Sequence, residues 1–171
     1  PVLVNSLLSA GELRSIVEQS RPKLIFTEAA RADTVRELRA SGLIDQVVCR
    51  DGAGANEISF ESLTAHPNRA LASADTLANE PAFIVYTSGT TGTPKGIVHA
   101  HRWIVALGDL NRYRLPPQDD DVVMATGEWS FISALGHNLL FPLRNGVTGA
   151  VLSSRATPEN ILAAIEKFRV T

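Results

Sequence analysis

Residues 86–96 read Tyr86-Thr87-Ser88-Gly89-Thr90-Thr91-Gly92-Thr93-Pro94-Lys95-Gly96. The apolar run 81–86 before this stretch predicts a buried strand, and the run 97–99 after it predicts a second, short strand. The glycines give the connecting loop many backbone conformations, so its N–H groups can turn together towards an anion. Lys95 adds a compact positive charge. The stretch therefore predicts a loop that binds a polyphosphate.

The loop offers hydroxyl groups, backbone N–H groups and one ammonium group to phosphate oxygens. We expect the phosphate-binding residues to be Thr87, Ser88, Gly89, Thr90, Thr91, Gly92, Thr93 and Lys95. The spacing differs from the common P-loop, G-x-x-x-x-G-K-[ST], because Pro94 precedes the lysine and Gly96 follows it. A flexible surface hairpin is the alternative interpretation of such a composition. The buried strand that leads into the loop favours phosphate binding.

The composition is that of a globular unit with enough chain to bury a core. The 171 residues are 44% hydrophobic and 20% charged, with a net charge of −2. Sixteen Lys and Arg residues stand against 18 Asp and Glu residues without a long run of either sign, which argues against a nucleic-acid surface and a polybasic membrane patch. The single cysteine, Cys49, leaves no internal disulfide and fits a cytoplasmic protein. No stretch is as long and apolar as a transmembrane helix, and Pro1 in place of Met indicates that the natural N-terminus lies elsewhere.

Strand-like and helix-like segments alternate along the chain, which predicts an α/β fold with a mostly parallel sheet. We expect strands at residues 2–4, 23–27, 46–49, 81–86, 97–99, 122–125 and 147–152. We expect helices after Ser9 and Thr157 and over residues 29–40, 101–113 and 131–141. In the last helix, Ile161, Leu162, Ile165 and Phe168 form an apolar stripe that we expect to be buried. Residues 51–80 are rich in Gly, Ala, Asn and Ser, and we interpret them as a surface connection within a single partial domain, 1–171.

The stretch from Tyr86 to Gly96 resembles the signature phosphate loop of the adenylate-forming enzymes, which include acyl-CoA synthetases, nonribosomal adenylation domains and beetle luciferases. The resemblance continues at lower specificity over most of the chain and implies part of the large N-terminal domain of such an enzyme. The adenine-binding and ribose-binding motifs and the small C-terminal domain with its catalytic lysine have no counterpart here, so no catalytic residue is assigned. Thr126-Gly127-Glu128 is similar to the family's T-G-D ribose motif, but it lies much closer to Lys95 in sequence than that motif does. We therefore assign Glu128 no ribose role.

The resemblance implies activation of a carboxylic acid by ATP, accompanied by Mg²⁺, through an acyl-adenylate, followed by thioester formation with coenzyme A. The phosphate loop would then hold the β- and γ-phosphates. No carboxylate of this chain is assigned as a metal ligand. Asp119-Asp120-Asp121 lacks the alternating spacing of a calcium loop, and we interpret it as a solvated turn. His99 and His101 have no third ligand near them in sequence, and we expect His99 to support the phosphate loop from behind.

The segment from Trp129 to Leu143 resembles the helix that borders the acyl pocket in aryl-CoA ligases of the benzoate type. The resemblance implies pocket residues Phe131, Ser133, Ala134, Gly136 and His137, with Gly136 allowing close approach of a ligand. An imidazole at position 137 can meet a carboxylate, whereas a histidine that is only packed or hydrogen-bonded is the alternative.

Two other functions fit the same sequence. An adenylation domain would load a carrier protein in place of coenzyme A, and a non-catalytic nucleotide-binding or assembly module would keep the loop without the chemistry. Because the resemblance covers a fragment, we expect the isolated chain to be inactive and to bind ATP weakly. We also expect self-association through an apolar face or sheet edge that the fragment leaves exposed.

Overall fold

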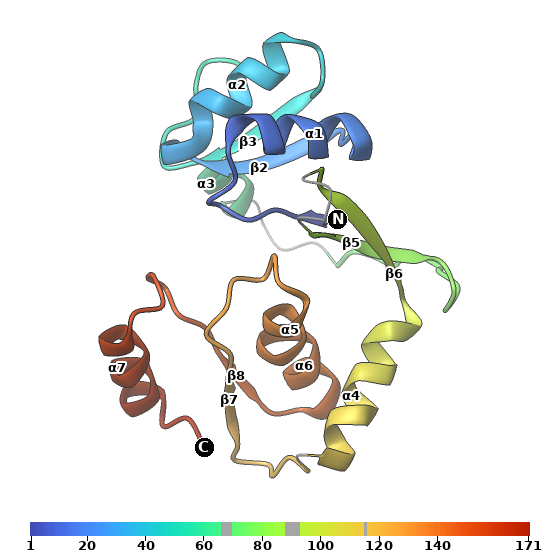
Figure 1. Ribbon diagram of the computed structural model, residues 1–171, viewed down its shortest axis with the longest axis vertical. Coiled ribbons are helices and arrows are strands. Elements are labelled where there is room, and N and C mark those ends of the chain that lie inside the picture. The colour runs from blue at the N-terminus through green and yellow to red at the C-terminus, as the bar shows by residue number, and fades with distance from the viewer. Residues whose placement is uncertain (66–69, 88–92, 115) are drawn as a thin grey trace. The chain divides into compact units, whose positions relative to one another are not determined.

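The computed structural model of the chain describes residues 1–65, 70–87, 93–114 and 116–171 (Figure 1). These residues group into two compact units, which we describe separately. The first unit comprises Pro1–Leu7, Thr76–Thr87 and Lys95–Thr171, and the second comprises Leu8–Asp75 together with the described residues Thr93 and Pro94. The segment 51–80, expected to be a connection within one domain, contributes to both units, so the single partial domain stays a prediction.

The second unit is a small parallel α/β layer, as the alternation of segments predicts. Its elements are α1 (Ala10–Ser20), β2 (Leu24–Glu28), η1 (Ala29–Arg31), α2 (Ala32–Ala40), β3 (Gln46–Arg50), β4 (Ile58–Ser59) and α3 (Phe60–Thr64). The strand order is β2-β3-β4, and both pairings are parallel. The strand β4 pairs only two residues with β3, and a run of two residues is too short to give a strand signal, so this pairing was not predicted.

Local sequence signals set the ends of α1. The Ser9 side chain accepts a hydrogen bond from the Glu12 N–H, and the Glu12 carboxylate accepts one from the Ser9 N–H, which is the expected capping box. The Ser9 hydroxyl, which donates to the Glu12 carboxylate at 2.6 Å, and the Ser9 N–H together lower the pKa of Glu12. The helix ends at Ser20, where Arg21 turns into the left-handed region before Pro22.

Helices α1 and α2 bury their apolar stripes in one cluster with strand β3. Leu13 and Val17 of α1 meet Val35 and Leu38 of α2 there, and Val47 lies against them from the strand. The apolar side chains Val35 and Leu38 of α2 therefore face inward, as the 3.6-residue period of the helix predicts. Cys49 is fully buried on β3, and burial raises the pKa of its thiol, which fits the expected structural role.

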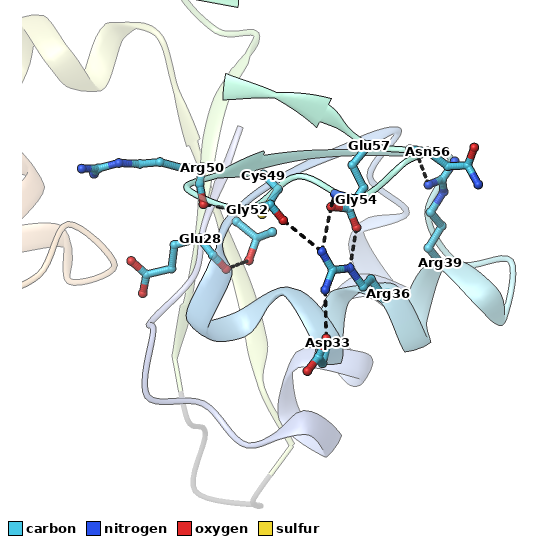
Figure 2. Close-up of polar contacts among 11 residues, drawn as sticks. Glu28, Asp33, Arg36, Arg39, Cys49, Arg50, Gly52, Gly54, Asn56 and Glu57 are labelled. Carbon is cyan, nitrogen blue, oxygen red and sulfur yellow. Dashed lines mark hydrogen bonds and ion pairs between the residues drawn. The ribbon is translucent and has the colours of Figure 1, made fainter. Parts of the chain in front are cut away.

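A buried carboxylate ties the connection after β3 to α2 (Figure 2). Glu57 has a side chain only 4% exposed, and its two oxygens accept hydrogen bonds from Arg36 Nε at 2.7 Å and Nη2 at 3.0 Å. The Gly54 N–H donates to the same carboxylate at 2.7 Å, and Arg36 also donates to Asp33 at 2.9 Å. Arg36 and the Gly54 N–H lower the pKa of Glu57 from 4.5 to about 2. The pair thus holds residues 52–57 against α2.

This pair predicts a specific acid sensitivity of the second unit. A depressed carboxylate pKa adds stability above the unfolded-state value of 4.5, and that stability is lost as the pH falls from about 5 to about 2. We expect Glu57→Gln to cost about 2 kcal/mol at pH 7 and to flatten this part of the pH profile. Both tryptophans lie in the first unit, so far-ultraviolet circular dichroism during urea unfolding should be the readout. A variant whose pH profile parallels the wild type between pH 5 and pH 2 would contradict the assignment.

The first unit combines two small sheets with helices. Its elements are β1 (Val2–Leu3), β5 (Pro81–Thr87), β6 (Lys95–Ala100), α4 (Arg102–Arg114), β7 (Val122–Met124), α5 (Ile132–Leu135), η2 (Gly136–Leu140), α6 (Phe141–Asn145), β8 (Thr148–Ala150) and α7 (Pro158–Phe168). Strand β5 pairs in parallel with β1 and antiparallel with β6, while β7 and β8 are parallel. The expected strands on both sides of the phosphate loop are confirmed, and the pairing of β5 with β6 is antiparallel within an otherwise parallel set.

The helix expected over residues 131–141 is longer and is interrupted by one wide turn. Segments α5, η2 and α6 follow one another without a break, and η2 is a π-helical turn. Pro142 directly follows the expected range, and the helix continues through it because it lies in the first turn of α6. Proline has no N–H to donate to the carbonyl four residues earlier, and a wide turn accommodates that missing donor. The continuous helix packs on β7 and β8 (Figure 1).

Two glycines allow this unit to pack closely around that helix. A Cβ added to Gly136 would lie 2.7 Å from Leu107 Cδ2 of α4, so the glycine lets the two helices approach. A Cβ added to Gly149 of β8 would lie 2.6 Å from the backbone oxygen of Asn138. That contact is with backbone, which cannot move aside as a flexible side chain can.

The packing predicts opposite effects for two glycine-to-alanine substitutions. We expect Gly149→Ala to destabilise the first unit by about 1–3 kcal/mol, the range typical of overpacking. Gly11 of α1 has no atom within 4 Å of an added Cβ, and Gly11→Ala should stabilise that helix by about 0.5–1 kcal/mol. Thermal unfolding by circular dichroism checks both. A neutral or stabilising Gly149→Ala would contradict the close approach.

The last helix corrects one expectation from the sequence. Thr157 caps α7 and Pro158 is its first residue, as predicted, but Leu162 is 66% exposed. Ile165 and Phe168 are also exposed, and Ala164 is the buried residue of the helix. An apolar stripe predicts a partner surface, and no element within the described ranges covers this one. After α7, the Thr171 N–H donates to the Val122 oxygen at 3.2 Å, so residue 171 lies beside β7.

Candidate functional site

The expected phosphate loop spans the turn between β5 and β6. Thr87 is the last residue of β5, and Lys95, the first residue of β6, lies directly opposite it in the antiparallel register. Thr87, Thr93 and Lys95 are all exposed. Ser88, Gly89, Thr90, Thr91 and Gly92 lie outside the described residues. The hairpin register thus brings the lysine at one end of the loop beside the threonine at the other.

An aromatic cluster in the first unit fixes the two strands of this hairpin to each other. Phe83 of β5 and His99 of β6 are register partners, and their rings stack with centroids 4.8 Å apart. Trp103, in the first turn of α4, meets both rings edge-on, at 5.6 Å from Phe83 and 5.2 Å from His99. His99 therefore packs within this cluster and stabilises the strand that begins at Lys95, while its expected support of the phosphate loop stays a prediction.

Gly96 allows a second contact across the same hairpin. A Cβ added to it would lie 3.1 Å from Tyr86 Cζ and 3.1 Å from Ile84 Cγ2, so the Tyr86 ring lies over the glycine backbone. Tyr86 is also its register partner. The glycine directly after the lysine thus serves the strand pairing.

The five expected pocket residues have different surroundings in the structure. Phe131 and Ser133 are exposed, whereas Ala134 and Gly136 are buried within the first unit. Gly136 faces Leu107 of α4, a contact that accounts for a glycine without any ligand. His137 is half-buried, and its Nδ1 lies 2.7 Å from the Ser133 carbonyl oxygen one turn earlier. The structure therefore brings Ser133 and His137 together and turns Ala134 and Gly136 away from solvent.

The turn before α5 contains hydrogen-bonding groups that the fold does not use. Trp129 Nε1 and Ser130 Oγ are buried without a hydrogen-bond partner among the described residues. Native folds leave few such groups, and they are concentrated where a water, an ion or a ligand supplies the partner. A shallow, mostly apolar depression also borders this turn, lined by Trp129, Leu139, Leu143, Val147 and Val151 among others.

Two features of the described residues bear on metals and membranes. No group of three or more His, Cys, Asp or Glu side chains in the described ranges is arranged to hold a metal ion, so His99 and His101 form no such group there. Within those same ranges, every helix is too short or too polar to cross a bilayer.

The whole chain matches one family. The family of AMP-binding enzymes matches residues 1–171 without a gap at either end. This chain belongs to the AMP-binding enzyme family.

Several relatives of this AMP-binding chain are named as aryl-CoA ligases. It is 27% identical over 172 residues to the 4-hydroxybenzoate–CoA/benzoate–CoA ligase of Rhodopseudomonas palustris, an alignment covering 100% of this chain and 32% of that protein. It is 30% identical over 172 residues to the 3-hydroxybenzoate–CoA ligase of an Aromatoleum species, covering 99% and 33%. The chain therefore spans about a third of the length of these relatives.

A solved structure shows the same fold. The crystal structure of the anthranilate CoA ligase AuaEII in complex with anthranoyl-AMP matches 99% of the AMP-binding chain and 34% of its own. The TM-score is 0.93 at 25% sequence identity. The α/β fold of this chain is thus that of part of the N-terminal domain of adenylate-forming enzymes.

The sequence predicted the two strands of the hairpin, but not the residues that pack against them. Trp103 carries a usable signal, because an aromatic residue in the first turn of the helix after β6 can reach back to the Phe83–His99 pair. Gln19, whose side chain reaches the Pro94 carbonyl, lies 75 residues away along the chain and has no such signal.

Proposed function

We propose that this chain is part of the ATP-binding domain of an enzyme that activates a carboxylic acid as its acyl-adenylate and then transfers the acyl group to coenzyme A. The observation that carries the proposal is the hairpin register, which sets Lys95 beside Thr87 at the two ends of the family's phosphate loop. The membership of the AMP-binding family and the benzoate–CoA ligase names of its relatives support it.

In the proposed reaction, a carboxylate oxygen of the acid attacks the α-phosphorus of ATP. The bond to the β-phosphate breaks, and pyrophosphate leaves with its negative charge. The thiol sulfur of coenzyme A then attacks the acyl carbon, loses its proton and displaces AMP. Catalysis of this kind depends on positioning and on stabilising charge, so the task of this chain is to hold the departing phosphates.

Lys95 would neutralise the β- and γ-phosphates from the start of β6. Thr87 and Thr93 would donate hydroxyl hydrogen bonds from the two sides of the loop, with Ser88, Gly89, Thr90, Thr91 and Gly92 between them. Mg²⁺ is expected to accompany the nucleotide as part of the substrate. The strand pairing and the Phe83–His99–Trp103 cluster would keep the lysine in place while charge develops on the leaving pyrophosphate.

The acid would bind near the turn that enters α5. We propose that Phe131, Ser133, Ala134, Gly136 and His137 border its pocket, with Phe131 and Ser133 on the accessible side. The His137 ring, whose Nδ1–H donates to the Ser133 carbonyl, offers its other nitrogen as an acceptor to a hydrogen-bond donor on the aryl ring, and as a donor to a carboxylate when the ring is protonated. The unpartnered Trp129 and Ser130 groups lie immediately before Phe131 and support a ligand site at this turn.

Product analysis with the full-length gene product tests this proposal. The protein is incubated with MgATP, benzoate and coenzyme A, and the expected products are benzoyl-CoA, AMP and pyrophosphate, identified by mass spectrometry. A panel of hydroxybenzoates, anthranilate and short aliphatic acids defines the acid class. A parallel reaction contains hydroxylamine, which traps the activated acyl group as a hydroxamate. Acid-dependent hydroxamate formation there, without any acyl-CoA in the reaction with coenzyme A, would favour a carrier-loading enzyme. A folded protein that consumes no ATP with any acid would favour a non-catalytic module.

A further inference from the structure

The continuous helix α5–η2–α6 of the first unit ends on the dipeptide Asn145-Gly146. Asn145 is the last residue of α6, and Gly146 follows it with a φ of 73°, in the left-handed region that glycine adopts without strain. Asn145 is half-buried, whereas Gly146 is exposed. The sequence contains no other asparagine followed by glycine.

An asparagine side chain can react with the backbone nitrogen of the residue that follows it. The Gly146 nitrogen would attack Asn145 Cγ, so that a new C–N bond forms while the bond from Cγ to Nδ2 breaks. The proton of the attacking nitrogen leaves with ammonia. Water then adds to either carbonyl carbon of the resulting succinimide ring and opens it to aspartate or isoaspartate. Glycine favours the attack because it has no side chain to obstruct it and rotates freely.

The folded turn opposes this attack at both reacting groups. The Gly146 N–H donates to the Pro142 oxygen at 2.9 Å, so the attacking nitrogen is already engaged. Asn145 Nδ2 donates to the Phe141 oxygen at 3.0 Å, which holds the side-chain amide over the preceding turn of the helix. The Val147 N–H also donates to the Pro142 oxygen, at 3.3 Å, and closes the turn. The reaction therefore requires these hydrogen bonds to open.

We propose that Asn145-Gly146 is a modification site, at which deamidation follows opening of the turn after α6 and leaves that turn less stable. Ends of helices open more readily than the core of a fold. This end is accessible to water, because Gly146 is exposed and has no atom within 4 Å of an added Cβ. The proposal concerns the stability of the first unit and does not depend on the proposed catalytic function.

The product would oppose closing of the turn. A carboxylate at position 145 has no proton to donate to the Phe141 oxygen. It also adds negative charge at the end of a helix, where the free carbonyl groups already carry partial negative charge. The neighbouring cation, Arg144, lies 3.4 Å from the Asp109 carboxylate, with which it pairs. The isoaspartate product in addition lengthens the main chain by one methylene group.

Peptide mapping of the full-length gene product tests the site. The protein is incubated at neutral pH with and without guanidinium chloride, digested with trypsin and analysed by mass spectrometry. A sample digested before incubation gives the baseline. Cleavage after Arg144 and Arg155 releases residues 145–155, in which Asn145 carries the one side-chain amide. Conversion at this position can therefore be assigned without ambiguity.

Asn5 provides an internal reference. It precedes Ser6, another small residue, and both lie outside the helices and strands of the described residues. In the native protein we expect Asn145 to deamidate more slowly than Asn5. In denaturant we expect the rate at Asn145 to rise about tenfold or more, because the protecting hydrogen bonds are lost, and to exceed the rate at Asn5. The rate at Asn5 should change far less.

Three variants test the effect of the modification on the turn. Asn145→Asp presents one product directly and should lower the thermal midpoint further than Asn145→Ala, which removes the donor without adding charge. Asn145→Gln keeps an amide on a longer side chain, which cyclises more slowly. During incubation the midpoint of the wild type should therefore fall, while that of Asn145→Gln stays constant.

Equal rates at Asn145 in native and denatured protein would overturn the proposal, because the turn would then give no protection. An Asn145 that stays intact in denaturant would overturn it as well, since the pair would not be a modification site. An Asn145→Asp variant as stable as the wild type would contradict the loss of stability on which the proposal also depends.

Discussion

Lys95→Ala is expected to lower acid-dependent release of pyrophosphate by the full-length protein about 10²- to 10³-fold, the usual cost of removing one group that stabilises developing charge. The lysine begins β6 at the end of the phosphate loop, is exposed, and lies opposite Thr87. Its exposure means that the substitution removes charge and not packing. The thermal midpoint should therefore stay unchanged.

Matched variants sharpen this prediction. Lys23→Ala removes another exposed lysine and should leave the rate unchanged. Lys95→Arg should recover only part of the activity, because a planar guanidinium does not replace a compact ammonium at a defined position. Thr87→Val should cost less than Lys95→Ala, since other hydroxyl and backbone donors of the loop remain. Pyrophosphate release that falls less than threefold in Lys95→Ala would remove the lysine from the phosphate site.

Asn138→Leu is expected to destabilise the first unit by about 3 kcal/mol. The buried amide of Asn138 forms two hydrogen bonds with the backbone of Ala125: its oxygen accepts from the Ala125 N–H at 2.5 Å, and its nitrogen donates to the Ala125 oxygen at 2.8 Å. The pair continues β7 by one residue into the turn that leads to α5. Leucine of similar volume would leave both backbone groups without these partners.

Both tryptophans report on this unit, so tryptophan fluorescence during urea unfolding is the measurement. Asn145→Ala on α6 is the control, because its side chain makes one hydrogen bond, to the Phe141 oxygen at 3.0 Å. We expect it to cost about 1 kcal/mol. An Asn138→Leu variant no less stable than Asn145→Ala would show that the paired hydrogen bonds do not hold the turn.

The sequence predicted the features that depend on local chemistry. The capping box at Ser9, the proline-started helix after Thr157 and the strands on both sides of the phosphate loop each follow from neighbouring residues, and each is confirmed. The mostly parallel α/β fold followed from the alternation of segments and from the resemblance at residues 86–96.

Features that depend on distant residues were not predicted. The ion pair between Arg36 and Glu57 and the contact of Gln19 with Pro94 join residues far apart along the chain, which no local pattern reports. The exposure of Leu162 shows a second limit of prediction from sequence. An apolar stripe indicates that a helix needs a partner surface, but not whether the described residues provide that surface. The wide turn before Pro142 was not predicted, because the expected helix stops at residue 141.

For the candidate site, the phosphate loop and its lysine stay a prediction from the sequence, while the structure added the hairpin register and the aromatic cluster of Phe83, His99 and Trp103. The pocket residues came from resemblance alone. Their separation into exposed and buried positions depends on how α4 packs against the continuous helix α5–η2–α6, which the sequence does not encode locally.

The central claim is that this chain belongs to an enzyme that forms an acyl-adenylate before any thiol takes part. Exchange of labelled pyrophosphate into ATP by the full-length protein, measured without coenzyme A and with a panel of aromatic and aliphatic acids, tests that claim most directly. The account predicts exchange that requires an acid and is lost in Lys95→Ala. No exchange with any acid in a folded protein, or exchange that persists in Lys95→Ala, would contradict it.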